Sequence, residues 1–324
     1  MQEQFEFPFD ELPKDIRETE IGQYLKLPDF AHLIQSSKAN QTLFKPLLDE
    51  QKLPTFLHRA VRREDDAVQK ILINDPTLLS KRGKVTDCSG RTFENISAFE
   101  YMLWALDKHG WTMLLECIPK TKNNEELVKE LLAQYNKVKN EGVTYTLNGI
   151  KITEQHFDFK NTIIKELQDQ VDASNVPNPN WDSIDKQWRE GVGGAQKLFP
   201  MHVVYEYCSD EPFNPIPKFN SKPKSSSQFY NWITNKLESW FSSDSLLGGE
   251  FAIYKATAER AGGAGAGVPR TVRWLGCTCD LLAMKALCEI RTSDFIVLKS
   301  TLENLLKLTI KPEHKNNNQG CIIF

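Results

Sequence analysis

Apolar residues recur along most of the chain at spacings of three and four, which is typical of helices that bury one face. Residues 9–50 follow this pattern and predict a short unit of two or three helices. Residues 53–119 hold two similar stretches that each predict a helix pair, with the polar residues 81–95 inserted between them. We expect further helices over 123–139, 159–171, 181–208 (a pair), 229–241 and 280–310, the last divided in two with Ser293 as an N-cap.

One segment predicts β-structure. Residues 144–153 place β-branched and apolar residues on both sides of Asn148-Gly149, a pair that favours the tight turn of a hairpin. Loops are expected at 176–180, at 213–227 and at the Gly/Ala-rich residues 260–269. The expected fold class is therefore mostly α, with at most a small β-hairpin.

Composition and charge narrow the range of functions. The 324 residues are 40% hydrophobic and 26% charged, which is enough apolar material for a large core or for two or three smaller units. Forty Lys and Arg against 43 Asp and Glu give a net charge of -3, so we expect no nucleic-acid partner. Residues 1–10 are acidic and aromatic, which does not predict a signal peptide, and no apolar run approaches the ~18 residues of a membrane span.

The cysteines predict neither disulfides nor a metal site. There are seven, scattered along the chain without a paired spacing, which fits reduced thiols in a cytosolic compartment. Cys277 and Cys279 are the only close pair, and no histidine lies at ligand spacing around them. We therefore assign no metal ligand.

Enzymatic motifs are also missing from the sequence. The stretch Gly262–Gly267 lacks both the dinucleotide-binding spacing and the Lys-Ser/Thr of a P-loop, so a flexible loop is expected there and no cofactor is assigned. His202 and Cys208 are six residues apart, which places them on different faces of one helix. We assign no catalytic residue, although dispersed carboxylates leave an active site within 143–275 as an open alternative.

The last four residues are the sharpest motif. Cys321-Ile322-Ile323-Phe324 matches the prenylation box, and Phe in the final position favours a geranylgeranyl group. The polar residues 313–320 before it provide the flexible strand that a transferase needs to reach the thiol. We expect a host prenyl transferase to attach a lipid to Cys321. A single lipid anchors a protein weakly, so membrane residence is expected to be dynamic.

Residues 9–50 resemble a known docking module. Leu12-Pro13-Lys14-Asp15-Ile16, with apolar residues following at 21, 24 and 25, resembles the F-box, through which substrate receptors bind the Skp-type adaptor of cullin ubiquitin ligases. In that family the Leu-Pro pair and the next apolar residues fill a groove of the adaptor. The resemblance implies that the anchors here are Leu12, Pro13, Ile16, Ile21 and Leu25. A plain helical cap, with Pro13 in the first turn, is the alternative interpretation.

The next region resembles ankyrin repeats. Thr55-Phe56-Leu57-His58-Arg59-Ala60 is similar to their Thr-Pro-Leu-His-x-Ala motif, and the apolar residues 68, 71 and 72 are similar to their second helix. The resemblance implies that Thr55 and His58 hold the turn before a first helix, so His58 is interpreted as structural. The second copy is degenerate, and two repeats would need flanking helices for stability.

In combination, these features resemble translocated effectors of Legionella-type intracellular bacteria, which use host ligases and host prenyl transferases. The resemblance implies an F-box-like docking module at 9–50 and degenerate ankyrin-like repeats at 53–139. It further implies a mostly helical client-recognition region at 140–311 and a flexible tail with the prenylation box at 312–324.

The function implied is that of a non-catalytic substrate adaptor delivered into the host cell. It would recruit the cullin ubiquitin ligase to an unknown host client while the lipid holds it at the cytosolic face of a host membrane. Two alternatives remain at this point. One is a prenylated enzyme with its active site in 143–275, and the other is a prenylated ankyrin-like scaffold that binds no ligase.

Overall fold

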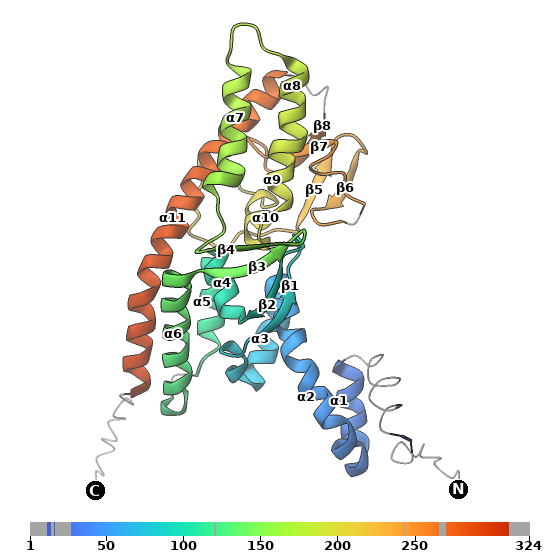
Figure 1. Cartoon of the computed structure of the whole chain (residues 1–324), viewed down its shortest axis with the longest axis vertical. Coiled ribbons are helices and arrows are strands. Elements are labelled where there is room, and N and C mark those ends of the chain that lie inside the picture. The colour runs from blue at the N-terminus through green and yellow to red at the C-terminus, as the bar shows by residue number, and fades with distance from the viewer. Residues whose placement is uncertain are drawn as a thin grey trace, which may run out of the picture.

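The computed structural model shows an elongated molecule with a long carboxyl-terminal helix along one side and two separate β-sheets (Figure 1). The structure describes residues 12, 13, 16, 27–119, 121–242, 244–265 and 270–310. Its helices in the amino-terminal half are α1 (Leu27–Ser36), α2 (Lys38–Val61), α3 (Asp65–Asn74), α4 (Ala98–Trp104), α5 (Lys108–Glu116) and α6 (Glu125–Glu141), with 3-10 turns at Pro76–Leu79 and Lys122–Asn124.

The first two helices form a hairpin at one end of the molecule. Ser37 caps α2 by accepting a hydrogen bond from the Asn40 N–H at 3.1 Å. Phe44 is fully buried in this hairpin, whereas Phe56 and Leu57, three turns later in α2, are buried in the main core. The helix α2 therefore starts in the hairpin and ends inside the body of the protein.

The first sheet consists of four antiparallel strands in chain order: β1 (Gly83–Thr86), β2 (Thr92–Ile96), β3 (Val143–Leu147) and β4 (Ile150–Glu154). The predicted hairpin at 144–153 is confirmed by β3 and β4, where Asn148 and Gly149 have φ of 50° and 79° as a tight turn requires. Strands β2 and β3 pair through Thr92 and Thr146 and diverge beyond them. This divergence opens a cavity that is described below.

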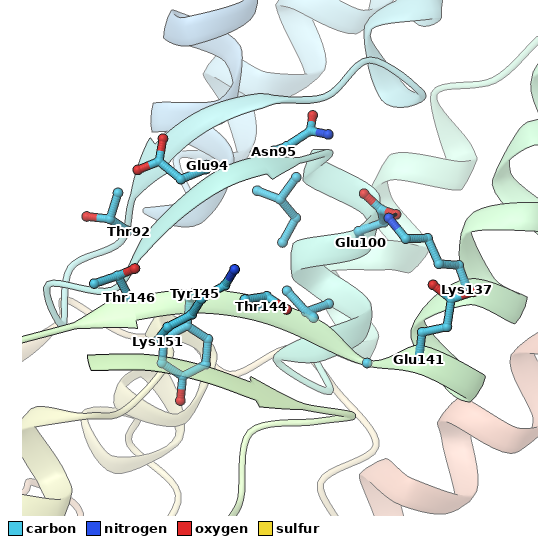
Figure 2. A pocket seen from close by; sticks show the side chains of 13 residues that line it. Thr92, Glu94, Asn95, Glu100, Lys137, Glu141, Thr144, Tyr145, Thr146 and Lys151 are labelled. Carbon is cyan, nitrogen blue, oxygen red and sulfur yellow. Dashed lines mark ion pairs between the residues drawn. The ribbon is translucent and has the colours of Figure 1, made fainter. Parts of the chain in front are cut away.

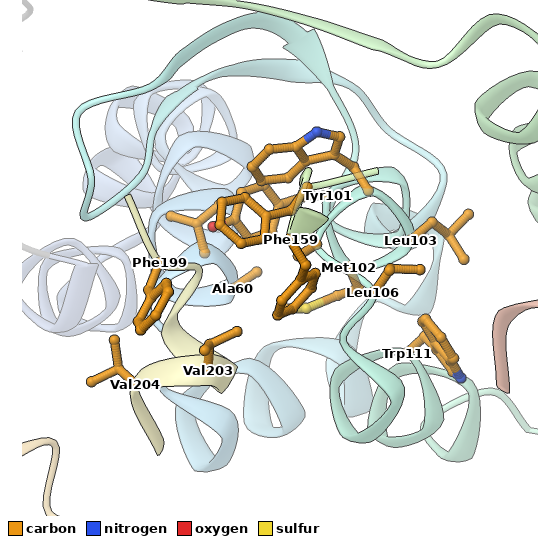
Figure 3. Packing of buried hydrophobic residues seen from close by; sticks show 14 of the residues in the cluster. Ala60, Tyr101, Met102, Leu103, Leu106, Trp111, Phe159, Phe199, Val203 and Val204 are labelled. Atoms are coloured by element: carbon orange, nitrogen blue, oxygen red, sulfur yellow. The ribbon is translucent and has the colours of Figure 1, made fainter. Parts of the chain in front are cut away.

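Aromatic side chains fill the core beneath the first sheet. The Trp104 ring lies 5.2 Å from that of Phe93 and 5.5 Å from that of Tyr145, in edge-to-face arrangements. The guanidinium of Arg91 lies 5.1 Å from the Trp104 ring and is itself buried. Figure 3 shows that the same core continues to Phe199, Val203 and Val204, which come from the carboxyl-terminal half. The two halves of the chain therefore share one core.

The carboxyl-terminal half adds helices and a second sheet. Its strands have the order β6-β5-β8-β7, with β5 and β8 parallel and the other pairs antiparallel. Two π-helical turns, Lys160–Ile164 and Gln187–Val192, precede α7 and α9. The elements are α7 (Lys165–Ser174), α8 (Trp181–Lys186), α9 (Gly193–Lys197), α10 (Met201–Tyr207), β5 (Gln228–Asn231), β6 (Lys236–Ser239), β7 (Phe251–Tyr254), β8 (Gly262–Gly265) and α11 (Arg270–Ile310).

The expected fold class, mostly α with at most a small hairpin, is wrong, because the described residues form eight strands in two four-stranded sheets. Residues 229–241, expected to be a helix, form the hairpin of β5 and β6, and the polar insert 81–95 contains β1 and β2. These strands are four or five residues long, and a short apolar run does not distinguish a strand from a helix by its period.

The glycine-rich residues 260–265 are also not a flexible loop. Strand β8 is buried along its whole length, and Trp188 Nε1 donates a hydrogen bond to the Ala264 carbonyl at 2.7 Å. A Cβ at Gly263 would lie 2.8 Å from a ring carbon of Phe229 and 2.9 Å from one of Phe251. The glycines are therefore present because aromatic rings pack directly on the backbone of this strand.

Two helical predictions also need correction. Helix α11 is continuous from Arg270 to Ile310, and the Ser293 hydroxyl donates to the Glu289 carbonyl within the helix instead of capping a new one. Residues 55–60 lie within the last turns of α2, not at the start of a helix as the ankyrin resemblance implied. The Nδ1 atom of His58 lies 3.0 Å from Nη1 of Arg62, four residues further along the chain. The turn that the ankyrin resemblance implied at Thr55 and His58 is therefore wrong, whereas α4 and α5 form a helix pair in the second of the two similar stretches.

We predict that Gly263→Ala lowers the free energy of unfolding by about 1–3 kcal/mol, because the new methyl group overpacks against Phe229 and Phe251. The control is Gly194→Ala in α9, where an added Cβ meets no atom within 4 Å and helix propensity favours alanine. Urea denaturation of both variants checks this. Equal stability of the two variants would contradict the packing described for β8.

Candidate functional site

A group of buried charges lies where the amino-terminal and carboxyl-terminal halves meet. Arg63 forms ion pairs with Asp65, at 2.9 Å, and with Asp107, and all three side chains are almost completely buried. Burial acts to raise the pKa of Asp107, but the charge of Arg63 and the hydrogen bonds from Arg63 and the Gly110 N–H together help to lower it to about 2, so this carboxylate stays charged. The His202 ring, whose Nε2 lies 2.6 Å from the Ala105 carbonyl, has its pKa lowered to about 4 by burial. These groups hold α2, α4 and α10 together.

A second buried group surrounds Lys255, which follows β7. Its Nζ donates to the carbonyls of Glu206 and Ser209 at 2.7 and 2.9 Å and to the Ser209 hydroxyl at 2.7 Å. Burial lowers the pKa of Lys255 to about 8. The Asp280 carboxylate on α11 accepts the backbone N–H groups of Lys255 and Ala256, and burial raises the pKa of Asp280 to about 7.

Arg291 of α11 connects this group to the amino-terminal half. Its guanidinium donates to Glu206 at 3.2 Å and to the Phe219 carbonyl at 2.9 Å, and it lies 3.2 Å from His109 Nε2. Lys255, Asp280 and Arg291 are each 0% exposed, so solvent does not reach their charged groups. The pKa of Lys255, within 143–275, is shifted as at many active sites, but its Nζ is buried and bonded to protein groups, so it holds elements together.

His202 and Cys208 also do not form a pair of base and nucleophile. The His202 ring contacts the Ala105 carbonyl, whereas burial raises the pKa of the Cys208 thiol to about 12, far from the range of a reactive thiolate. Among the residues that the structure describes, no group of three or more His, Cys, Asp and Glu is arranged to hold a metal ion. None of the described helices is long and apolar enough to cross a membrane.

A polar cavity of about 320 Å³ lies where β2 and β3 diverge, and Figure 2 shows its side chains. Its most buried charge is Glu100 of α4, which completes a capping box with Ser97. The Glu100 carboxylate pairs with Arg82 at 2.7 Å and Lys137 at 3.7 Å, so both of its oxygens have partners from the protein. The cavity therefore has room for water or a small polar molecule, while its buried carboxylate already has a structural role.

The residues predicted to bind a Skp-type adaptor are described in part. Leu12 is half-buried, Pro13 is exposed and Ile16 is 39% exposed. Ile21 and Leu25 lie outside the described residues, as does the predicted lipid-attachment residue Cys321. The helix that follows them, α1, packs chiefly on α2 and stands away from the body in Figure 1.

Sequence reasoning missed an apolar groove between α5 and α11. It has a volume of about 480 Å³ and is lined mainly by Trp111, Leu115, Val297, Leu298, Leu305 and Leu308. Val297, Leu298, Leu305 and Leu308 recur at helical spacing, so an apolar face was visible in the sequence, but the spacing does not show that α5 lies beside it. The ion pair of Arg291 with Glu206 carries no comparable signal, because the two residues are 85 positions apart along the chain.

Comparison with known proteins places the chain in a family. A family model described as the CBUA0006 C-terminal domain matches residues 162–302. The uncharacterized protein CBUA0006 of Coxiella burnetii is 38% identical over 276 residues, which cover 79% of this chain and 77% of the relative. The chain belongs to the CBUA0006 family. No solved structure matches it.

The matched CBUA0006 C-terminal domain contains the whole Lys255 group. Glu206, Lys255, Asp280 and Arg291 all fall within residues 162–302, as does most of α11. Arg291 contacts His109 outside that domain, and the Tyr135 hydroxyl donates to the Phe295 carbonyl at 3.2 Å. In this member of the CBUA0006 family, the carboxyl-terminal domain is therefore joined to the preceding helices through α11.

We predict that Glu206 makes the free energy of unfolding of the protein depend on pH. Burial outweighs the attraction of Arg291 and raises the pKa of Glu206 from 4.5 to about 7. Since the folded-state pKa lies above the unfolded one, the stabilisation is present below pH 4.5 and is lost as the pH rises to 7. Relative to Glu206→Gln, the free energy of unfolding of the unmodified protein falls by about 1–3 kcal/mol over this interval.

Urea denaturation of both proteins at several pH values measures this difference. The buried histidines titrate in both proteins, so their contributions cancel. A difference that stays constant between pH 4.5 and 7 would contradict the raised pKa of Glu206 in the folded protein.

Proposed function

We propose that this protein is a host-directed substrate adaptor that recruits a cullin ubiquitin ligase through its amino-terminal residues. In this proposal, Leu12, Pro13, Ile16, Ile21 and Leu25 bind the Skp-type adaptor, and Cys321 carries a geranylgeranyl group. The lipid keeps the protein at the cytosolic face of a host membrane after its delivery into the host cell. A region within 140–311 binds the host client.

The observation that carries the proposal is the arrangement of α1 and α2. The hairpin that they form at the end of the molecule leaves α1 clear of the body (Figure 1). The far end of α2 is fixed in the main core through Phe56, Leu57 and Ala60. A docking module must be accessible and also hold its position relative to the client, and one continuous helix that spans both regions meets both needs.

The position of α11 supports the membrane part of the proposal. Its carboxyl-terminal end lies at the same end of the long axis as α1 and opposite the connection between α7 and α8 (Figure 1). A lipid attached beyond Ile310 would therefore bring the docking hairpin close to the membrane. The remainder of the body would then extend towards the cytosol.

The hairpin of β5 and β6 offers a surface for the client. Trp232, Ile233 and Leu237 expose about half of their surface there, on a strand pair at the edge of the second sheet. Exposed apolar residues that gather in one place are typical of protein-binding surfaces. Once ligase and client share this scaffold, ubiquitin transfer becomes effectively intramolecular, so the protein itself needs no catalytic group.

We predict that Leu12→Ala combined with Pro13→Ala abolishes recovery of the Skp-type adaptor and its cullin from host-cell lysate. The truncated side chains would no longer fill the groove of the adaptor. The matched control is Ile150→Ala, which replaces an exposed isoleucine at the start of β4 and leaves recovery unchanged. Circular dichroism confirms that both variants fold. Failure of the unmodified protein to recover the adaptor would reduce residues 9–50 to a helical cap and favour a scaffold without ligase binding.

We predict that Cys321→Ser moves the protein from membranes to the cytosol of host cells, because serine accepts no prenyl group. Fractionation of cells that express either protein measures this shift, and the thermal unfolding of the two proteins should be the same. Membrane retention of the serine variant would contradict lipid attachment, whereas adaptor recovery is expected to be unaffected by the change.

A further inference from the structure

The groove between α5 and α11 presents apolar surface that the described chain leaves uncovered. Its floor is buried, since Trp111 and Leu298 are each 3% exposed. Its walls are open, because Val297 and Leu308 expose more than half of their surface. The groove is therefore shaped like a binding site for an apolar segment and not like a tightly packed helix contact.

Both helices contribute one face each. The α11 residues that line the groove lie at 294, 297, 298, 301, 304, 305 and 308, and those of α5 at 108, 111, 112, 115 and 116, so each set recurs every three or four residues. From Asp294 to Leu308 the α11 face is about 21 Å long. Lys108 and Asp294 form an ion pair of 2.8 Å at the end of the groove that is farther from Leu308.

We propose that this groove binds residues 321–324 of the same chain. The sequence Cys-Ile-Ile-Phe supplies the apolar side chains, and it follows the polar residues 311–320. Leu308, which lines the groove, is only two residues before the end of α11, so the segment is tethered beside its site.

The length of the tether fits the groove. A flexible chain of ten residues has a root-mean-square end-to-end distance of about 17 Å. The middle of the groove at Thr301 is about 14 Å back along α11 from Ile310. A tether that matches its span gives an effective concentration in the millimolar range, so a weak contact is enough to keep the segment docked.

The groove also suits an extended backbone. Thr112, Thr301 and Asn304 place hydroxyl and amide groups among its apolar residues. These groups provide hydrogen-bond partners for the N–H and C=O groups of a docked segment. A docked segment also shields the Cys321 thiol. This inference goes beyond the proposed function, because it concerns the unmodified chain and requires neither a ligase nor a transferase.

The test is the rate at which iodoacetamide alkylates Cys321 in the full-length, unmodified protein, followed by mass spectrometry of the peptide that contains it. A synthetic peptide of residues 311–324 gives the rate for a free thiol. Val297→Asp disrupts the groove, and Ile296→Asp is its matched control. The two neighbours are 61% and 63% exposed, and residue 296 does not line the groove.

We expect Cys321 in the native protein and in Ile296→Asp to react ~10-fold more slowly than the peptide, as for a segment docked nine-tenths of the time. In Val297→Asp the rate should approach that of the peptide. Circular dichroism checks folding, and Leu308→Asp near the helix end replaces Val297→Asp if that variant unfolds.

Three results would overturn the proposal. One is a native rate equal to that of the peptide. Another is protection that both groove variants retain, which would place the segment elsewhere. The third is protection that increases with protein concentration, which would assign the groove to the segment of a second copy. None of these results depends on whether the Skp-type adaptor or a prenyl transferase recognises the protein.

Discussion

The buried guanidinium of Arg291 fixes the position of the longest helix, and the arrangement of the molecule depends on it. It connects α11 to Glu206 of α10, to the Phe219 carbonyl and to His109 of α5. A buried charge is tolerated only when such partners surround it, and removing one partner is expensive because the others stay desolvated. These contacts therefore permit few alternative placements of α11. The position of α11 in turn determines the groove that it forms with α5 and the point at which residues 311–324 begin.

The proposed function would make use of this rigidity. Ubiquitin transfer by proximity requires that the docking hairpin, the client surface and the lipid hold defined positions relative to one another. Helix α2 joins the hairpin to the core without a break, and α11 runs from beside the second sheet to the end where α1 lies (Figure 1). The CBUA0006 C-terminal domain contributes most of α11 and the whole Lys255 group, so its polar core supports both ends of this arrangement.

The sequence predicted long elements better than short ones. Helix α6 and the hairpin of β3 and β4 were expected, since the first has a sustained helical period and the second an Asn-Gly turn. Strands β5 and β6 were missed because each is only four residues long, and the glycines of β8 suggest a loop until the rings of Phe229 and Phe251 are seen to pack on them. Of the candidate site, Pro13 and Ile16 are exposed and Leu12 is half-buried, whereas Glu206 and Arg291 gave no local signal.

Direct binding between purified components tests the central claim most plainly. The full-length protein is mixed with the Skp-type adaptor bound to the amino-terminal part of its cullin, and the mixture is analysed by size-exclusion chromatography with light scattering. The account predicts a complex that contains one copy of each chain. Separate elution of the two samples at micromolar concentrations, with the protein folded by circular dichroism, would contradict it.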